Sequence, residues 1–391
     1  MQARSLAQRE MPNLKRGLTL MLAASEVNTA VEFAESIVRF LNVFGRWRER
    51  DALLEKVASS QSLVNSGEKL TQAEFLMASQ RGETLWSQGR AAEAEKVFRG
   101  LLARMEAGAN YDSGYDRCLT LALLGRSLRA QGQPEAAAET HCDALAVAKK
   151  LEQTEQVRRM AGKIHTDLAD VLTDLARYDE AREQYETSLA ISQNVDDKRQ
   201  VAVVLGQLGT LALQQGNLTE ARQRYTAALT AFRNLGEPQS EAILWHQLGR
   251  VAEETPDWEE AERCYKESLA IEERYGNKAG AAQTCNQLAI AADNAGRPEE
   301  AERWYKRAIA INMEISNRVE LAGNNNLADL LLAQNRLDEA EQYAHRAREI
   351  QETLDLSSQP WMTFNILAKI ADKRAAADPA HAAEHAKTAQ G

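Results

Sequence analysis

The residues best suited to catalysis lie close to the end of the chain, where His381, Glu384 and His385 spell HxxEH. On a helix this spacing puts both histidines on one face, and two imidazoles beside a carboxylate form the core of many catalytic zinc sites. Only six residues follow His385, so no downstream carboxylate is available to complete the site. We therefore expect a solvated terminal helix without metal.

Paired carboxylates are the second feature that could do chemistry. Glu259 and Glu260 form one pair, and Glu299 and Glu300 form another. Both pairs fall in the first turn of an expected helix, where negative side chains complement the helix dipole. The pairs therefore require no acid–base role, and no local spacing of serine, histidine and aspartate suggests a catalytic triad.

The cysteines and the absence of a phosphate loop also indicate no catalytic or cofactor site. Cys118, Cys142, Cys264 and Cys285 form no CxxC pair and no metal-ligand spacing, so we expect small buried hydrophobic residues in a reducing, cytoplasmic setting. The sequence contains no GxxxxGK[ST] loop that would cradle a nucleotide phosphate. It therefore predicts a protein that is not an enzyme and that needs no cofactor.

A repeated phrase organises most of the chain. Each copy carries an alanine before a stretch of helical spacing, as in GNLTEARQRY and GRPEEAERWY, and successive alanines are 43, 44, 40, 40, 40 and 39 residues apart. The repeat alanines are Ala94, Ala137, Ala181, Ala221, Ala261, Ala301 and Ala340. A period in this range predicts a solenoid of stacked units.

Each unit reads as two helices joined by a tight turn. In the copy around residues 205–232, apolar and small residues recur every three or four positions before and after the turn. We expect the small residues Gly209 and Ala221 to face each other across the hairpin, with Tyr225 filling the space one turn later. No single hairpin can bury both of its faces, so each needs neighbours.

This pattern resembles the tetratricopeptide repeat family. Trp245, Leu248, Gly249, Ala261 and Tyr265 match its motif of a large residue, Leu-Gly, Ala and an aromatic residue. The resemblance implies an all-α solenoid, a right-handed superhelix of helix-turn-helix hairpins. The units are longer than the 34 residues usual in the family, and they lack its proline. They resemble the longer version found in kinesin light chains and in bacterial regulators.

The N-terminal stretch resembles a second group of proteins. The phrases EMPNLKRGL and GRWRE are similar to the segment that precedes the repeats in STAND regulators, the signal-transduction ATPases with numerous domains. The residues that carry this resemblance are Glu10, Asn13, Leu14, Leu18, Gly45, Arg46, Trp47 and Glu49. The resemblance implies a sensor arm whose ligand releases or reorders a nucleotide-binding core.

In the tetratricopeptide repeat family the first helices of the hairpins line a concave groove, and the resemblance places a set of polar residues there. The candidates for binding a peptide are Arg126, Arg129, Lys163, Asp170, His246, Arg250, Asn286, Asn325 and Asp329. Asparagine amides can hold a peptide backbone with both donor and acceptor, and arginine can bind a carboxylate with two hydrogen bonds. The alternative is that these side chains are solvated or paired between neighbouring repeats.

Composition excludes some partners. The formal net charge of −10 and the pI of about 5.4 argue against general affinity for nucleic acid, which requires many lysines and arginines. No apolar stretch is long enough to span a membrane. We therefore expect a protein or peptide ligand, with no nucleic-acid or membrane partner.

These observations predict three regions and one class of function. Residues 1–66 form a divergent helical hairpin region, 67–356 form seven repeats, and 357–391 form capping helices. We expect a non-enzymatic module that binds a protein or peptide, as the sensor arm of a STAND-type signalling protein. The alternative is a free-standing cytoplasmic scaffold. As a sensor arm the chain is expected to dock to an upstream nucleotide-binding domain, and as a scaffold it is expected to assemble partners or to self-associate as a homo-oligomer.

Overall fold

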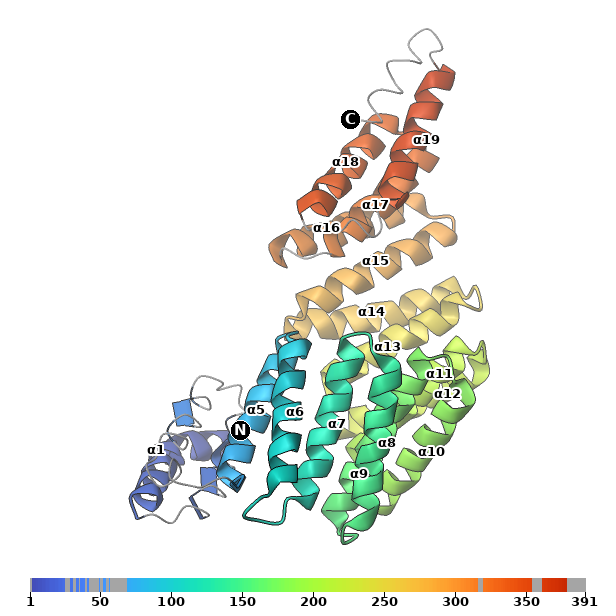
Figure 1. The fold of residues 1–391 in the computed structure, drawn as a ribbon. Helices are drawn as coiled ribbons and strands as arrows, with labels where there is room; N and C mark the ends of the chain where they lie inside the picture. The colour runs from blue at the N-terminus through green and yellow to red at the C-terminus, as the bar shows by residue number, and fades with distance from the viewer. Residues whose placement is uncertain are drawn as a thin grey trace. The chain divides into compact units, whose positions relative to one another are not determined.

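The computed structural model describes residues 2–24, 69–315, 319–353 and 361–377, together with isolated residues between 29 and 56. These residues are almost entirely helical (Figure 1). Within them there is no β-strand, only one isolated bridge between Leu70 and Ala109. The prediction of an all-α repeat fold is confirmed. The HxxEH residues and Gly45, Arg46 and Trp47 lie outside the described part.

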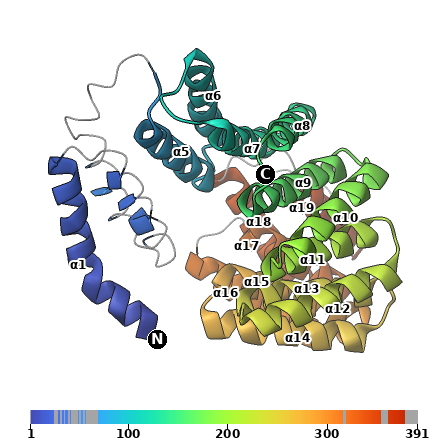
Figure 2. The ribbon, with the colours of Figure 1, turned by 90° about the horizontal axis from the view of Figure 1, so that it is seen from below.

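The chain divides into two compact units, Met1–Gln200 and Val201–Gly391. In unit 1, helices α5 to α10 follow one another side by side as hairpins (Figures 1 and 2). The helices of unit 1 are α1 (Gln2–Ala23), α5 (Gln72–Ser87), α6 (Ala91–Ala107), α7 (Gly114–Ala130), α8 (Pro134–Lys150), α9 (Glu155–Asp174) and α10 (Tyr178–Asn194).

Unit 2 continues the same alternation of helices. Helix α11 (Lys198–Gln214) begins just before the boundary and lies mostly in this unit. The others are α12 (Leu218–Leu235), α13 (Pro238–Glu253), α14 (Trp258–Tyr275), α15 (Lys278–Asn294), α16 (Pro298–Ile315), α17 (Val319–Ala333), α18 (Leu337–Thr353) and α19 (Trp361–Ala377). We call the first helix of a hairpin (α5, α7, α9, α11, α13, α15, α17) an A helix and the second a B helix.

The turn between an A helix and its B helix has a fixed backbone geometry. Gly216 and Gly296 stand there with φ of 74° and 73°, in the left-handed region that glycine adopts without steric cost. Asn217 and Asp257 then cap the following B helices, because their side chains accept hydrogen bonds from the backbone amides of Glu220 and Glu260. The turn residues of the repeated phrase thus stop one helix and start the next.

A contact between a glycine and a ring closes several of the hairpins. A Cβ built on Gly209 would lie 2.7 Å from the Tyr225 ring, and one on Gly249 would lie 2.5 Å from the Tyr265 ring. Tyr225 therefore packs directly against the glycine, as well as filling the space predicted for it. The repeat alanines are fully buried beside these rings, so the core is built from one small and one large residue in alternation.

The hairpin of α7 and α8 has a different ring. Its aromatic position holds His141, which is fully buried against Gly125. Neither ring nitrogen of His141 has a hydrogen-bond partner among the described residues. Burial, aided by Arg126 and Arg129, lowers its pKa from 6.5 to about 4, so the ring is neutral at pH 7.

Arginines at the A–B turns link successive hairpins of unit 2. Arg297 contacts Glu262 of the preceding B helix at 2.5 Å and Glu300 of its own B helix at 2.6 Å. Arg336 repeats the arrangement with Glu302 at 2.5 Å. These charge-assisted contacts fix the register between neighbouring repeats.

Three of the four cysteines behave as predicted. Cys118, Cys264 and Cys285 are buried free thiols, and burial raises the pKa of each to between about 11 and about 12. Cys142 is exposed on α8, so the prediction of burial is wrong for this residue. The reason is its place one residue after His141, on the outward side of a B helix.

Candidate functional site

The side chains predicted to bind a ligand all lie on A helices. We call the surface that these helices present at the predicted positions the A-helix face. Each position can be compared between hairpins by counting back from the repeat alanine, so Arg126, eleven residues before Ala137, is equivalent to Arg250, eleven before Ala261. The structure therefore allows the same position to be examined in unit 1 and in unit 2.

In unit 1 the arginines of α7 pair with carboxylates of the next A helix. Nε of Arg126 donates to Asp167 on α9 at 2.8 Å. Arg129 donates to Asp170 at 3.0 Å and to Asp174 at 2.5 Å, in both cases through its guanidinium. The structure thus brings Arg126, Arg129 and Asp170 together, but in contacts that bind neighbouring repeats to each other.

Two carboxylates of this network, Asp167 and Asp170, are largely buried, whereas Asp174 is exposed. Burial raises the pKa of Asp167 to about 6, against the opposing effect of Arg126. Asp170 also has a raised pKa for the same reason, and it accepts a hydrogen bond from the Tyr185 hydroxyl at 2.5 Å. Every charged group of the network therefore has a partner inside unit 1, and little capacity remains for an external ligand.

Lys163 stands apart from this network. It is exposed on α9 and makes no hydrogen bond or ion pair with a described residue. It lines a hollow of about 470 Å³ between α7 and α9. The hollow is lined by Tyr115, Leu119, Glu155, Gln156, Arg159, Met160 and Lys163.

In unit 2 the predicted residues have fewer charged partners. The Arg250 side chain is exposed on α13, and its hydrogen bond within the described part goes to the neutral amide oxygen of Gln247 at 3.1 Å. No described carboxylate forms an ion pair with it. Two turns earlier on the same helix, Ile243 is 61% exposed. An unpaired guanidinium and an exposed apolar side chain therefore lie on one face.

His246 lies between these two residues but points into the packing. Its Nδ1 lies 3.2 Å from the Thr284 hydroxyl of α15, and its ring meets the edge of Tyr265. Burial and the nearby Arg250 lower the pKa of His246 to about 4, so it is neutral at pH 7. Its role in the structure is a contact between two A helices.

Asn286 and Asn325 differ in how far their side-chain amides are available to a ligand. The Asn286 side-chain oxygen accepts a hydrogen bond from Asn326 at 3.2 Å, and its own amide nitrogen has no partner among the described residues. Asn325 is only 4% exposed, and its oxygen accepts from Thr363 of α19 at 3.0 Å. Asn286 can therefore donate to a ligand, whereas Asn325 is taken up by the contact between α17 and α19.

Asp329 completes the predicted set. It is exposed on α17 and has no ion pair in the described part. It faces Asp293 of α15 closely enough that its charge, after the larger effect of burial, raises the pKa of Asp293. This end of unit 2 therefore carries two carboxylates without a basic partner.

Three further residues matter on this face, and none of them was predicted from the sequence. Asp167 and Asp174 were not among the candidates, although a carboxylate one repeat after each arginine is a detectable signal for pairing between repeats: Asp167 follows Arg126 by 41 residues and Asp174 follows Arg129 by 45. Ile243, which is 61% exposed, was not among the candidates either. Its position opposite the packed Leu248–Gly249 pair was the signal that could have placed it on the surface.

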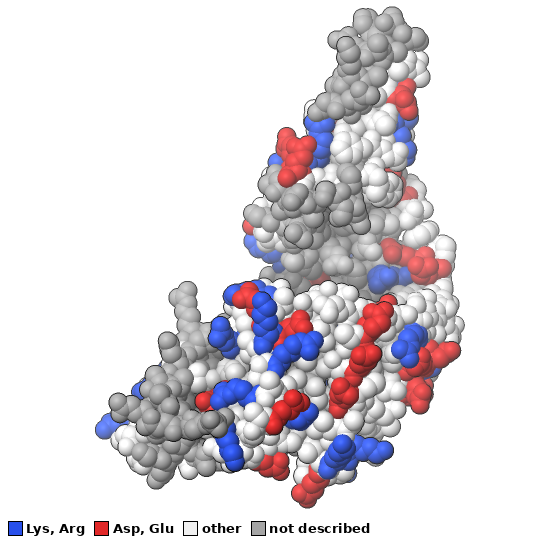
Figure 3. All heavy atoms as spheres, in the orientation of Figure 1, with Lys and Arg blue, Asp and Glu red and all other residues white. Residues whose placement is uncertain are grey.

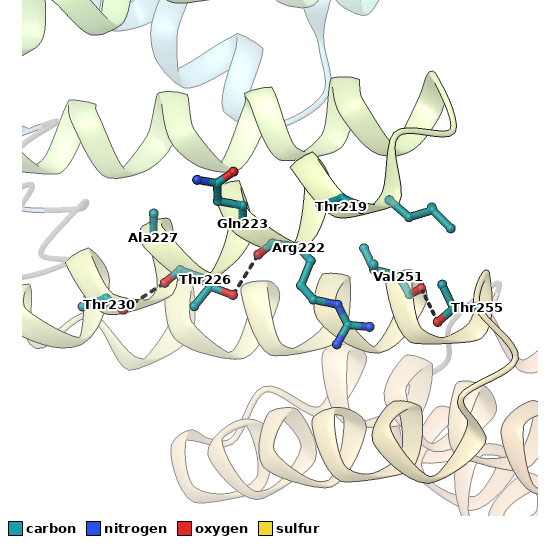
Figure 4. A pocket seen from close by; sticks show the side chains of 9 residues that line it. Thr219, Arg222, Gln223, Thr226, Ala227, Thr230, Val251 and Thr255 are labelled. Atoms are coloured by element: carbon teal, nitrogen blue, oxygen red, sulfur yellow. Dashed lines mark hydrogen bonds between the residues drawn. The ribbon is translucent and has the colours of Figure 1, made fainter.

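A second hollow lies outside the A-helix face. It measures about 550 Å³ and follows α12, and Figure 4 shows Arg222 extending on the side where Val251 and Thr255 lie. The hydroxyls of Thr226, Thr230 and Thr255 donate to backbone carbonyls of their own helices. This hollow therefore offers one arginine and few other free donors.

Among the described residues, neither the charges on the face drawn in Figure 3 nor the metal-ligating side chains suggest another chemistry. On the view in Figure 3, acidic and basic side chains are interspersed over α6 and α7 of unit 1, without a patch of one sign. No cluster of metal-ligating side chains occurs among the residues searched, which are the described ones. None of the described helices is both long and apolar enough to cross a bilayer.

Family models agree with this architecture. Models described as tetratricopeptide repeat match residues 119–140, 160–234, 240–314 and 325–354. The chain is a tetratricopeptide repeat protein. A fold of this kind presents surfaces for other proteins, and its helical hairpins are generally interaction modules. No curated protein sequence matched the chain.

Solved structures of tetratricopeptide repeat proteins share the fold. A STAND ATPase with a tetratricopeptide repeat sensor from Pyrococcus horikoshii has a TM-score of 0.66 at 15% identity, covering 93% of this chain and 52% of that one. This chain thus corresponds to about half the length of the STAND protein.

Two further structures are similar along most of their own length. Aspartyl phosphate phosphatase F from Bacillus subtilis gives a TM-score of 0.55 at 11% identity, covering 87% of this chain and 93% of that one. A Rap protein complexed with competence and sporulation factor gives 0.53 at 15%, covering 96% and 99%. At these identities the similarity extends to the fold alone.

Proposed function

We propose that this tetratricopeptide repeat protein binds a peptide or a segment of another protein on the A-helix face of unit 2, and that it catalyses no reaction. The observation that carries the proposal is Arg250. Its guanidinium is exposed and bonds only a neutral amide in the described part of the chain. A guanidinium without a carboxylate partner can form two parallel hydrogen bonds with an incoming carboxylate.

Neighbouring side chains support this interpretation. Ile243 offers an exposed apolar surface on the same helix, and Asn286 offers a free amide on the next A helix. Apolar contact combined with a few placed polar groups is the usual composition of a peptide-binding surface. Asp329 adds an exposed carboxylate, which suits a ligand with a basic residue further along.

The other predicted residues take different parts in this proposal. Arg126, Arg129 and Asp170 hold α7 and α9 together, His246 holds α13 and α15 together, and Asn325 supports α17 against α19. Such contacts keep the A helices at fixed spacing. The proposed ligand then contacts a surface that is already ordered, which lowers the entropic cost of binding.

At the level of the whole protein, we propose that the chain serves as the sensing arm of a STAND-type regulator in the cytoplasm. The similarity to the Pyrococcus horikoshii sensor and the N-terminal phrases support this role. Ligand binding would favour one arrangement of the repeats over another and so change how they contact a nucleotide-binding core. The alternative is a free-standing scaffold. A phosphate loop and winged helix encoded in frame upstream would favour the sensing arm, and an independent start would favour the scaffold.

The surface itself can be tested by site-specific cross-linking. A photoreactive benzoylphenylalanine placed at Ile243 should cross-link a protein from native lysate, and Arg250→Glu in the same chain should abolish that product. Arg222→Glu is the matched control, since Arg222 is an exposed arginine on α12 outside the A-helix face. A product that survives Arg250→Glu, or that is lost equally with Arg222→Glu, would refute the assignment.

A further inference from the structure

The hollow between α7 and α9 in unit 1 has the composition of a binding pocket. Its floor is apolar, because Met160 is 6% exposed and Leu119 packs against the same core cluster. The half-buried ring of Tyr115 also packs on this cluster. The volume of about 470 Å³ is within the range of pockets that hold small ligands or single large side chains.

The polar groups around this floor divide into paired and unpaired ones. Arg159 is tied to Glu155 at 2.8 Å and to Asp197 at 2.9 Å. Lys163, Gln156 and the hydroxyl of Tyr115 have no hydrogen-bond partner in the described part of the chain. The one charge left unpaired at the rim is therefore the ammonium group of Lys163.

The charged side chains near the hollow restrict the charge that its ligand can carry. The Arg126 and Arg129 side chains of unit 1 are occupied by Asp167, Asp170 and Asp174. A single free lysine beside an apolar floor attracts one carboxylate, not a polyanion, because a polyanion needs several unpaired cations. The amide of Gln156 can serve a peptide backbone as donor and acceptor.

We propose that this hollow, which we call the Lys163 pocket (Tyr115, Leu119, Gln156, Met160 and Lys163), binds a peptide segment in which a large apolar side chain stands next to a carboxylate. The apolar side chain lies on Met160 and Leu119, and the carboxylate pairs with the ammonium of Lys163. This goes beyond the function proposed above, which concerns Arg250 and unit 2. It requires no contact between the two units.

Methyl NMR provides a direct test. The chain contains eight methionines, so methyl labelling gives few signals, and Met160→Leu identifies the one from the pocket. The probe is a blocked hexapeptide, Ser-Gly-Phe-Glu-Gly-Ser. It should shift the Met160 methyl signal in a saturable manner. The Phe-Gln peptide should bind about three- to fivefold more weakly, as expected for loss of one exposed ion pair, and the Ala-Glu peptide should not shift Met160.

The variants separate this proposal from the previous one. Lys163→Gln should make the Phe-Glu and Phe-Gln peptides equal in affinity, whereas Lys149→Gln, an exposed lysine on α8, should leave the preference intact. Arg250→Glu should not alter the Met160 response, so the two proposals can fail independently. An unmoved Met160 signal, or a preference for Phe-Glu that persists in Lys163→Gln, would overturn the assignment of this pocket.

Discussion

Arg126 in unit 1 and Arg250 in unit 2 occupy the same position of the repeat, directly after the glycine that packs on the B helix, yet they have different partners. Arg126 pairs with Asp167 of the next A helix at 2.8 Å, whereas Arg250 bonds Gln247 of its own helix at 3.1 Å. The position equivalent to Asp167 in the repeat after Arg250 is Gln287. One change from a carboxylate to an amide thus separates a paired arginine from an unpaired one.

Neighbouring positions of the A helices also carry a charge pair in unit 1 and none in unit 2. Asp170, which bonds Arg129 in unit 1, corresponds to Ile290 in unit 2, and Arg129 itself corresponds to Glu253. Burial raises the pKa of Glu253, which has no basic partner across the repeat. Complementary charges on successive A helices therefore stabilise unit 1 internally, while their absence leaves unit 2 with groups that can bind something else.

Each unit should have a core of the same kind, built around its repeat alanines. Overpacking at these alanines should have the largest effect on stability. Ala181 and Ala261 are fully buried repeat alanines, one in each unit. Tryptophan at either site should lower the free energy of unfolding by at least about 3 kcal/mol, since a well-packed contact between helices cannot accommodate the ring. Urea titrations of both variants should give similar losses. A loss in one unit only would mean that the two cores are not equivalent.

Acid should test the buried His141 of unit 1, which stands where unit 2 has Tyr265. The folded pKa of about 4 lies below the ordinary 6.5, so the unfolded chain takes up a proton first as the pH falls. The contribution of His141 to the free energy of unfolding is therefore fully present above about pH 6.5. It is lost as the pH falls towards 4, by up to roughly 3 kcal/mol. Melting temperatures measured across this range should fall for the natural chain and fall less for His141→Phe. Equal pH profiles would contradict the buried, neutral histidine.

Removing one arginine from each unit should expose the difference in pairing. Arg129→Met leaves Asp170 and Asp174 without their cation, and the Asp170 side chain is only 16% exposed, so we expect a loss of about 2 kcal/mol. Arg250→Met removes a solvated group and should change stability by less than about 0.5 kcal/mol. Chemical denaturation of the two single variants provides the measurement. An equal cost for both would show that Arg250 has a structural partner.

Much of this architecture follows from the sequence because the period and the small residues are local signals. The alanine spacing and the glycine–tyrosine pairs predict hairpins, and the rings of Tyr225 and Tyr265 do pack on Gly209 and Gly249. His141 could be placed at the aromatic position by alignment of the repeats. Its lack of hydrogen-bond partners could not, because that depends on how closely α7 and α8 approach.

The ligand-binding residues were harder to predict because a polar residue on an A helix has two possible partners, a ligand or the next repeat. Asn325 and Asn286 have the same residue type and the same repeat position, fifteen residues before the repeat alanine. Thr363 covers Asn325, whereas the Asn286 amide nitrogen has no partner among the described residues. A partner about 40 residues away decides the outcome, so single-residue patterns carry little information. The predicted role of these residues in peptide binding stays a prediction.

The substitution with the smallest expected effect on stability tests the role of Arg250 most directly, because it would give Arg250 the carboxylate partner that Arg126 has in unit 1. Gln287→Glu places a carboxylate at the position that Asp167 occupies in unit 1, opposite Arg250 on the preceding A helix. The new ion pair should stabilise the chain by at most about 1 kcal/mol, because one partner is exposed. It should also reduce cross-linking from position 243, because the guanidinium is then occupied. Gln283→Glu, at an exposed position on the same helix, controls for added negative charge. If Gln287→Glu stabilises the chain and leaves cross-linking unchanged, Arg250 is not the group that the ligand contacts.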